Sequence, residues 1–164
     1  MNTRVNVVEN GKGAMNAMLT FSGYAEKSGL EHSLLNLVYF RVSQINGCAY
    51  CLDMHWKDLR AIGETEQRMY SLDAWEESPY YTDRERAALA WTEAVTKICE
   101  THGPDEVYEG VRKQFSEKDI ANLTLTIATI NLWNRLAISM RAVPGRYQPA
   151  KRQEFREGAR ADAV

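Results

Sequence analysis

Two cysteines and a histidine lie within one short segment, Asn46-Gly47-Cys48-Ala49-Tyr50-Cys51-Leu52-Asp53-Met54-His55. A helix turns by about 100° per residue, so Cys48, Cys51 and His55 would share one helical face. Two thiols at this spacing can close a disulfide, and one of them can attack a peroxide or another disulfide. A helix N-terminus and a nearby imidazole would lower the pKa of the attacking thiol. The segment therefore predicts a redox dithiol with Cys48, Cys51 and His55 as catalytic residues.

Two alternatives to a redox pair stay open on residue types and spacing alone. In a zinc site the same three side chains would be ligands, and the fourth would have to be Cys99 or His102. Alternatively, the three side chains pack in the core with the neighbouring leucines, as free cysteines often do. Covalent haem attachment is excluded, because it needs a histidine directly after the second cysteine, where Leu52 stands.

The elements around the segment are expected to be helices, since apolar residues recur at helical spacing and no run alternates with a period of two. The fold class is therefore all-α. Cys48 would begin its own helix, where unpaired backbone N–H groups favour a thiolate. The expected helices cover residues 14–28, 33–45, 48–62, 64–75, 82–101, 105–113 and 116–140. Residues 1–13 are expected to be a loose lead-in, and residues 142–164 a frayed tail or an arm on a neighbouring subunit.

Length and charge narrow the class of protein further. The chain has 164 residues, which predicts a single domain over 1–164. A formal net charge of −2 gives no reason to expect nucleic acid or an anionic membrane as a partner. The N-terminus has no apolar run of signal-peptide type, so we expect a cytoplasmic protein in which cysteines serve redox or metal chemistry and not a permanent disulfide framework.

Two blocks of sequence resemble a known family. The segment Arg41-Val42-Ser43-Gln44-Ile45-Asn46, continuing through Cys48 to His55, is similar to the core motif of the alkylhydroperoxidase D (AhpD) family, within the carboxymuconolactone decarboxylase-like superfamily. Ile130-Asn131-Leu132-Trp133-Asn134-Arg135 resembles a second motif of these proteins. The resemblance spans about residues 30–141. It implies an all-α, AhpD-like domain that forms a homotrimer or homohexamer and reduces peroxides, or a partner's disulfide, with a dithiol reductant.

Carried over by position, Cys48 and Cys51 match the redox pair of the family and His55 matches its relay histidine. Asn36 stands where well-studied members have a glutamate that orients and charges this histidine, and Tyr50 stands where they have a second histidine. An amide can hydrogen-bond an imidazole but cannot stabilise an imidazolium as a carboxylate does. The resemblance therefore implies a weak peroxidase, or mainly a disulfide exchanger, with Asn36, Tyr50 and Trp133 near the thiols.

The i,i+4 spacing to His55 favours Cys51 as the attacking thiol, and Cys48 is then expected to be the more exposed thiol that faces a partner. Cys99 is expected to be a packed thiol. The chemistry needs neither a metal ion nor a cofactor. Two rival functions stay open, a decarboxylase acting on a lactone and a non-catalytic redox sensor or scaffold.

Overall fold

In the computed structural model, residues 2–149 are described, and all regular elements within them are helical. This confirms the all-α prediction. The elements are α1 (Val7–Asn10), α2 (Lys12–Glu26), α3 (His32–Asn46), α4 (Ala49–Ile62), α5 (Glu66–Tyr70), the 3₁₀ helix η1 (Leu72–Ala74), α6 (Asp83–Thr96), α7 (Ile98–Thr101), α8 (Asp105–Arg112) and α9 (Glu117–Ser139). No helix in this part of the chain is long and apolar enough to cross a membrane.

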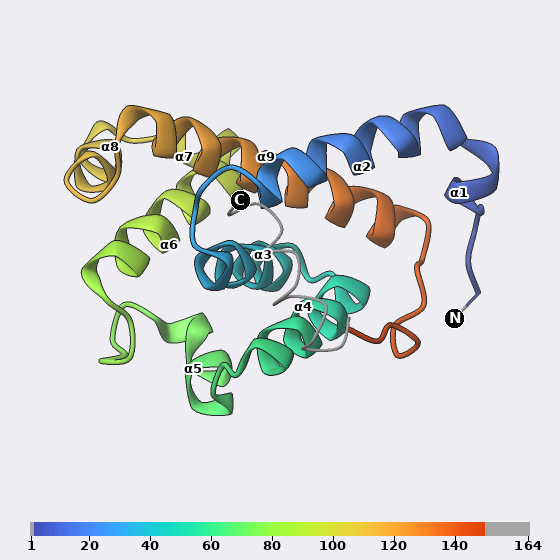
Figure 1. The fold of residues 1–164 in the computed structure, drawn as a ribbon, viewed down its shortest axis with the longest axis horizontal. Helices are drawn as coiled ribbons and strands as arrows, with labels where there is room; N and C mark the ends of the chain where they lie inside the picture. Colours follow the sequence, from blue (N-terminus) through green and yellow to red (C-terminus); the bar gives the residue numbers. More distant parts are fainter. Residues whose placement is uncertain (1, 150–164) are drawn as a thin grey trace, which may run out of the picture.

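Helix α3 lies at the centre of the fold. It packs against α4, α6 and α9, and Figure 1 shows it almost end-on between α9 and α4. All residues from 34 to 43 are buried, although the sequence predicted only one wide apolar face. A helix becomes buried all round when other elements cover it on several sides. The second half of α3 leads into the cysteine segment, so the core fixes the position from which that segment starts.

Two clusters of buried side chains meet on α3. The first joins α3 to α6, α8 and α9, and the second joins α3 to α4, α5, η1 and α6. Leu35, Val38 and Val42 belong to the first cluster, whereas Leu37 and Phe40 belong to the second. Because α3 contributes to both, α4 and α9 are held on a common scaffold.

The helix ends follow the capping signals in the sequence. Thr82 and Glu85 form a capping box at the start of α6, and the Ser116 side chain caps α9 by accepting a hydrogen bond from Asp119 N. Two expected helices are divided. Residues 82–101 form α6 and α7, because Lys97 adopts a ψ of 33° outside the helical range, and residues 64–75 form α5 and η1.

Both ends of the described chain contact other elements of the same chain. Residues 1–13 were expected to be loose, but they contain α1, and Arg4 N donates to Met140 O at 3.0 Å. Beyond α9, Gly145 N donates to Asp53 Oδ2 at 3.0 Å and Lys57 Nζ donates to Tyr147 O at 3.1 Å. The first part of the expected tail therefore lies along α4. Residues 150–164 of that tail lie outside the described residues.

Candidate functional site

The turn between α3 and α4 sets the position of the first cysteine. Gly47 ends α3 with φ 68°, a left-handed conformation that glycine adopts without steric cost. Cys48 is then the N-cap of α4, and its Sγ accepts a hydrogen bond from Cys51 N at 3.3 Å. The structure confirms the expectation that Cys48 stands at the start of its own helix.

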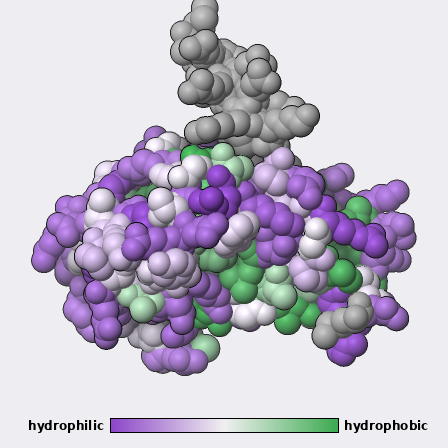
Figure 2. Space-filling view, turned by 90° about the horizontal axis from the view of Figure 1, so that it is seen from below, coloured by the Kyte–Doolittle hydropathy of each residue, from purple (hydrophilic) through white to green (hydrophobic). Residues whose placement is uncertain are grey.

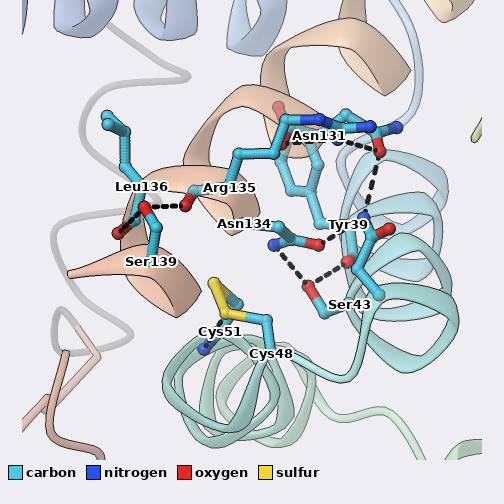
Figure 3. The surroundings of a disulfide bond; sticks show 10 residues. Tyr39, Ser43, Cys48, Cys51, Asn131, Asn134, Arg135, Leu136 and Ser139 are labelled. Atoms are coloured by element: carbon cyan, nitrogen blue, oxygen red, sulfur yellow. Dashed lines mark hydrogen bonds between the residues drawn. A yellow bond between two sulfur atoms is a disulfide. The ribbon is translucent and has the colours of Figure 1, made fainter. Parts of the chain in front are cut away.

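Cys48 and Cys51 are joined by a disulfide, with their Cα atoms 5.3 Å apart. Figure 3 shows the sulfur atoms pointing from α4 toward Asn134 on α9. Only 1% of Cys48 and 2% of Cys51 is exposed. The expectation that Cys48 is the more exposed thiol is therefore wrong, because the cap residue is covered when α4 packs on α9.

A cavity of about 1050 Å³ reaches the second cysteine of the pair. Its walls come from α2, α3, α4, α9 and the segment after α9, and they include Cys51 but not Cys48. The cavity also brings together the other predicted site residues, which are Asn36, Tyr50, His55 and Trp133. Trp133 is fixed in the wall, since its Nε1 donates to Ser22 Oγ at 2.9 Å. A small molecule in this cavity would meet Cys51 first.

His55 follows Cys51 by four residues in α4 and borders the same cavity, and 6% of its surface is exposed. Its ring lies 5.1 Å from the ring of Tyr39, measured between centroids, and neither ring nitrogen has a hydrogen-bond partner. Burial lowers the pKa of His55 to about 4, because a charged imidazolium is poorly solvated there. The ring is therefore neutral near pH 7 and has a free lone pair for a proton.

Asn36 does not hydrogen-bond His55, contrary to what its place in the motif suggested. Its Nδ2 donates to His32 O at 2.9 Å, one turn earlier in the same helix, and also lies 3.3 Å from His32 Nδ1. The side chain borders the cavity but is occupied by its own helix. Asn36 thus takes no part in orienting His55 in this arrangement.

A carboxylate that the sequence reasoning missed lies within ion-pair distance of the histidine. Asp58 Oδ2 is 3.7 Å from His55 Nδ1, and Asp58 Oδ1 accepts a hydrogen bond of 2.6 Å from Tyr147 Oη. Burial raises the pKa of Asp58. The i,i+3 spacing of His55 and Asp58 was a usable signal for this contact. No comparable signal pointed to Tyr147, which lies in the expected tail.

Two other carboxylates are paired with basic side chains. Glu31 Oε1 accepts from Arg84 Nε at 2.8 Å, and Asp53 Oδ2 accepts from Lys57 Nζ at 2.8 Å. These pairs leave Asp58 as the acidic group of α4 that faces His55.

The asparagines of α9 join this helix to the end of α3. Asn46 Nδ2 donates to Asn131 Oδ1 at 3.0 Å and to Asn134 Oδ1 at 2.9 Å, and Asn134 Nδ2 donates to Ser43 Oγ at 3.2 Å. Figure 3 shows this network directly beside the disulfide. It holds the end of α3 against α9 and so fixes the turn that precedes Cys48.

The remaining cysteine and histidines lie elsewhere or have other contacts. Cys99 is exposed, so the expectation of a packed thiol is wrong; the four-residue α7 that carries it has no buried residues. His32 borders the cavity, where its Nε2 lies 3.5 Å from Glu26 Oε2. Between residues 2 and 149, no three or more His, Cys, Asp or Glu side chains are grouped so that they could hold a metal ion.

Two known proteins are similar to this chain over most of its length. The chain is 42% identical over 140 residues to the uncharacterized protein YdfG of Bacillus subtilis, covering 85% of this chain and 95% of that one. A solved structure of a protein of unknown function from Agrobacterium tumefaciens, for which an AhpD antioxidant defence role has been suggested, is 42% identical with a TM-score of 0.86. That match covers 89% of this chain and all (100%) of the other.

A more distant structure supports the fold alone. The uncharacterized peroxidase-related protein from Ralstonia eutropha, which has an AhpD core, is 19% identical with a TM-score of 0.75 over 85% of this chain and 75% of its own. The model of the carboxymuconolactone decarboxylase family matches residues 12–94, which include α2, α3, α4 and the whole cysteine segment. The chain thus belongs to the carboxymuconolactone decarboxylase family and has its AhpD-like, all-α fold.

Proposed function

We propose that this protein is a thiol-dependent peroxidase in which Cys51 attacks the peroxide and Cys48 resolves the product. The observation that carries the proposal is the placement of Cys51, which is bonded to Cys48 and also borders the cavity that contains His55. An attacking thiol needs access to its substrate, a base, and a second thiol within bonding distance. Cys51 has all three.

The reaction proceeds in three balanced steps. The Cys51 thiolate forms an S–O bond with one peroxide oxygen, the O–O bond breaks, and an alcohol leaves after taking up a proton. The Cys48 thiol then attacks the Cys51 sulfenic acid, so that an S–S bond forms and water leaves. A dithiol donor supplies two electrons and two protons, which restores both thiols and converts the donor to its disulfide.

Burial of the sulfurs favours a small oxidant over a protein disulfide. Cys48 and Cys51 are at most 2% exposed, and the cavity leads to Cys51 only. A folded protein partner could not bring its disulfide into line with either sulfur without displacing α9 or the residues after it. We therefore favour peroxide reduction over disulfide exchange, and a small or slender dithiol as the donor.

The test is steady-state consumption of an organic hydroperoxide by the full chain with dithiothreitol as donor. Cys51→Ser should abolish turnover, and Cys48→Ser should leave a Cys51 sulfenic acid that a dimedone probe traps. Cys99→Ser is the matched control, since Cys99 is an exposed thiol outside the site. Full activity in both Cys48→Ser and Cys51→Ser would refute the mechanism.

A homotrimer or homohexamer is part of the same proposal. Figure 2 shows hydrophobic side chains gathered over the lower middle of one face, between more hydrophilic regions. Several large apolar side chains are at least 42% exposed, among them Val8, Leu19, Leu132 and Ile138. Assembly would cover part of such surface. Light scattering of the purified chain measures the number of subunits, and a monomer would contradict this part.

A further inference from the structure

His55 has no hydrogen-bond partner on either ring nitrogen, although a proton relay requires its ring to be oriented. A neutral imidazole carries its proton on one nitrogen, and the partner of that nitrogen decides which one. For His55 to accept the Cys51 proton on Nε2, Nδ1 must carry the hydrogen and face an acceptor. Asp58 is the group placed to be that acceptor.

We propose that Asp58, held in place by Tyr147, is the positioning carboxylate of His55; this inference rests on the proposed function. Asp58 Oδ2 lies 3.7 Å from His55 Nδ1, while Asp58 Oδ1 is anchored at 2.6 Å by the Tyr147 hydroxyl. Catalytic hydrogen bonds are often long in resting structures and shorten when the reacting groups are in place. Here the pair is oxidised, so Cys51 has no proton to give.

A carboxylate is needed because His55 alone is a weak base. Its pKa of about 4 is far below the ordinary thiol value of about 8.5, so an isolated His55 would hardly take the Cys51 proton. When the proton moves from Cys51 Sγ to His55 Nε2, the ring becomes positive. Asp58 would stabilise that charge through the hydrogen bond from Nδ1–H, as an oriented carboxylate does in other relays.

Other titratable or charged groups also border the cavity in which His55 lies. These groups come from α2, α3, α4 and the segment after α9, whereas the residues of α9 in the wall carry no charge. The groups are Glu26, Lys27, His32, Tyr39, Tyr50, Asp58 and Tyr147. Glu26 is the other carboxylate, and it lies beside His32 at 3.5 Å. Burial, followed by the nearby Glu26 carboxylate, raises the pKa of Tyr39, so Tyr39 stays a neutral phenol. Asp58 is thus the acid positioned for His55.

The role of Tyr147 follows from how its segment is held. Asp53 and Lys57 hold residues 145–147 on α4 through Gly145 N and Tyr147 O. The Tyr147 hydroxyl then donates to Asp58, which stabilises the ionised carboxylate in a half-buried position. Loss of the hydroxyl should weaken the orientation of Asp58 without removing its charge.

The experiment measures the alkylation rate of reduced Cys51 by iodoacetamide against pH in the full chain, with mass spectrometry assigning each cysteine. In Asp58→Asn the rate at pH 7 should fall about tenfold, because a rise of about one unit in the thiol pKa cuts the thiolate fraction by that factor. Tyr147→Phe should also raise the midpoint pH of the alkylation profile, but by less than Asp58→Asn does. The matched control is Asp105→Asn, which removes the charge of an exposed carboxylate on α8 outside the cavity wall and should keep the wild-type midpoint.

Each outcome bears on the proposal. An Asp58→Asn midpoint equal to that of the wild type and of Asp105→Asn overturns it. If Asp58→Asn does not fold, two other variants test the proposal. Asp58→Glu must keep most of the alkylation rate of Cys51. A midpoint in Tyr147→Phe equal to that of the wild type overturns the proposal. The readout is thiol reactivity and not turnover. Wild-type protein that consumes no peroxide would therefore refute the proposed function while the effect of Asp58 could still be measured.

Discussion

Asn46 Nδ2 donates to Asn134 Oδ1 at 2.9 Å, so a hydrogen bond joins the last residue of α3 to the C-terminal part of α9, directly before Cys48. Asn134 is fully buried at 0% exposure, and its own amide donates to Ser43 Oγ. A buried polar side chain of this kind stabilises the fold only while all its partners are present. The position of Cys48 thus depends on an amide network that has no part in the redox chemistry itself.

Asn134→Ala should lower the free energy of unfolding by about 2 kcal/mol, because it leaves buried polar groups without partners and creates a small cavity. Urea unfolding measures the loss. The control is Lys118→Ala on the same helix, where the side chain is exposed and the change should be below about 0.5 kcal/mol. Equal losses in the two variants would contradict the proposed importance of the network.

Replacement of glycine by alanine should destabilise the protein at Gly47 and stabilise it at Gly110. Gly47 has φ 68° and no atom within 4 Å of the position that a Cβ would take, so Gly47→Ala adds backbone strain only and should destabilise by about 1 kcal/mol. Gly110 lies inside α8, also with open space around it, and Gly110→Ala should stabilise by about 0.5 kcal/mol. Thermal unfolding of both variants provides the comparison, and shifts of equal sign would count against it.

His55 should make the stability of the protein depend on pH. Its pKa is about 4 in the folded chain and about 6.5 in the unfolded chain, so the unfolded state binds the extra proton between these values. The stabilising contribution is complete above pH 6.5 and is lost as the pH falls toward 4. The total loss is about 3 kcal/mol, of which about 2 kcal/mol falls between pH 7 and pH 5.

Urea unfolding of the wild type and of His55→Phe at several pH values isolates this contribution. Phenylalanine cannot titrate, and the ring it replaces has no hydrogen-bond partner to lose. The difference in unfolding free energy between the two proteins should therefore change by about 2 kcal/mol from pH 7 to pH 5. A difference that stays constant would mean that His55 is not buried as a neutral ring.

Local sequence signals predicted the helices and most of the site, but they did not predict contacts between residues that lie far apart in the sequence. Cys51 and His55 both border the cavity, whereas Cys48 precedes α4 as its N-cap and does not; Thr82 and Ser116 marked helix starts through their caps. The burial of Cys48 could not be read from periodicity, which gives the face of a helix but not what covers it.

The groups around His55 show the same limit. Tyr147 reaches Asp58 across 89 residues of sequence, and nothing in its own segment indicates that contact. The sequence shows that residue 36 is an asparagine. Whether its side chain faces His55 or its own helix depends on a rotamer that the sequence does not specify. Such features depend on tertiary packing, so they become visible only in the structure.

Moving the carboxylate tests whether Asp58 takes the role expected of a glutamate at position 36. Asn36→Glu alone should change the pKa of the Cys51 thiol little, because Asp58 already faces His55. In the Asp58→Asn background, Asn36→Glu should restore at least half of the lost alkylation rate at pH 7, since position 36 borders the same cavity as His55.

The matched control is Asn36→Gln in the Asp58→Asn background, which supplies the same length without the charge and should restore nothing. A rescue by glutamate but not by glutamine would show that the relay needs a negative charge near His55 and accepts it from either α3 or α4. If neither restores the rate, a group at position 36 cannot reach His55, and the geometry of Asp58 on α4 is then essential as well as its charge. Because all variants are compared at the level of thiol reactivity, the result does not depend on the choice of peroxide.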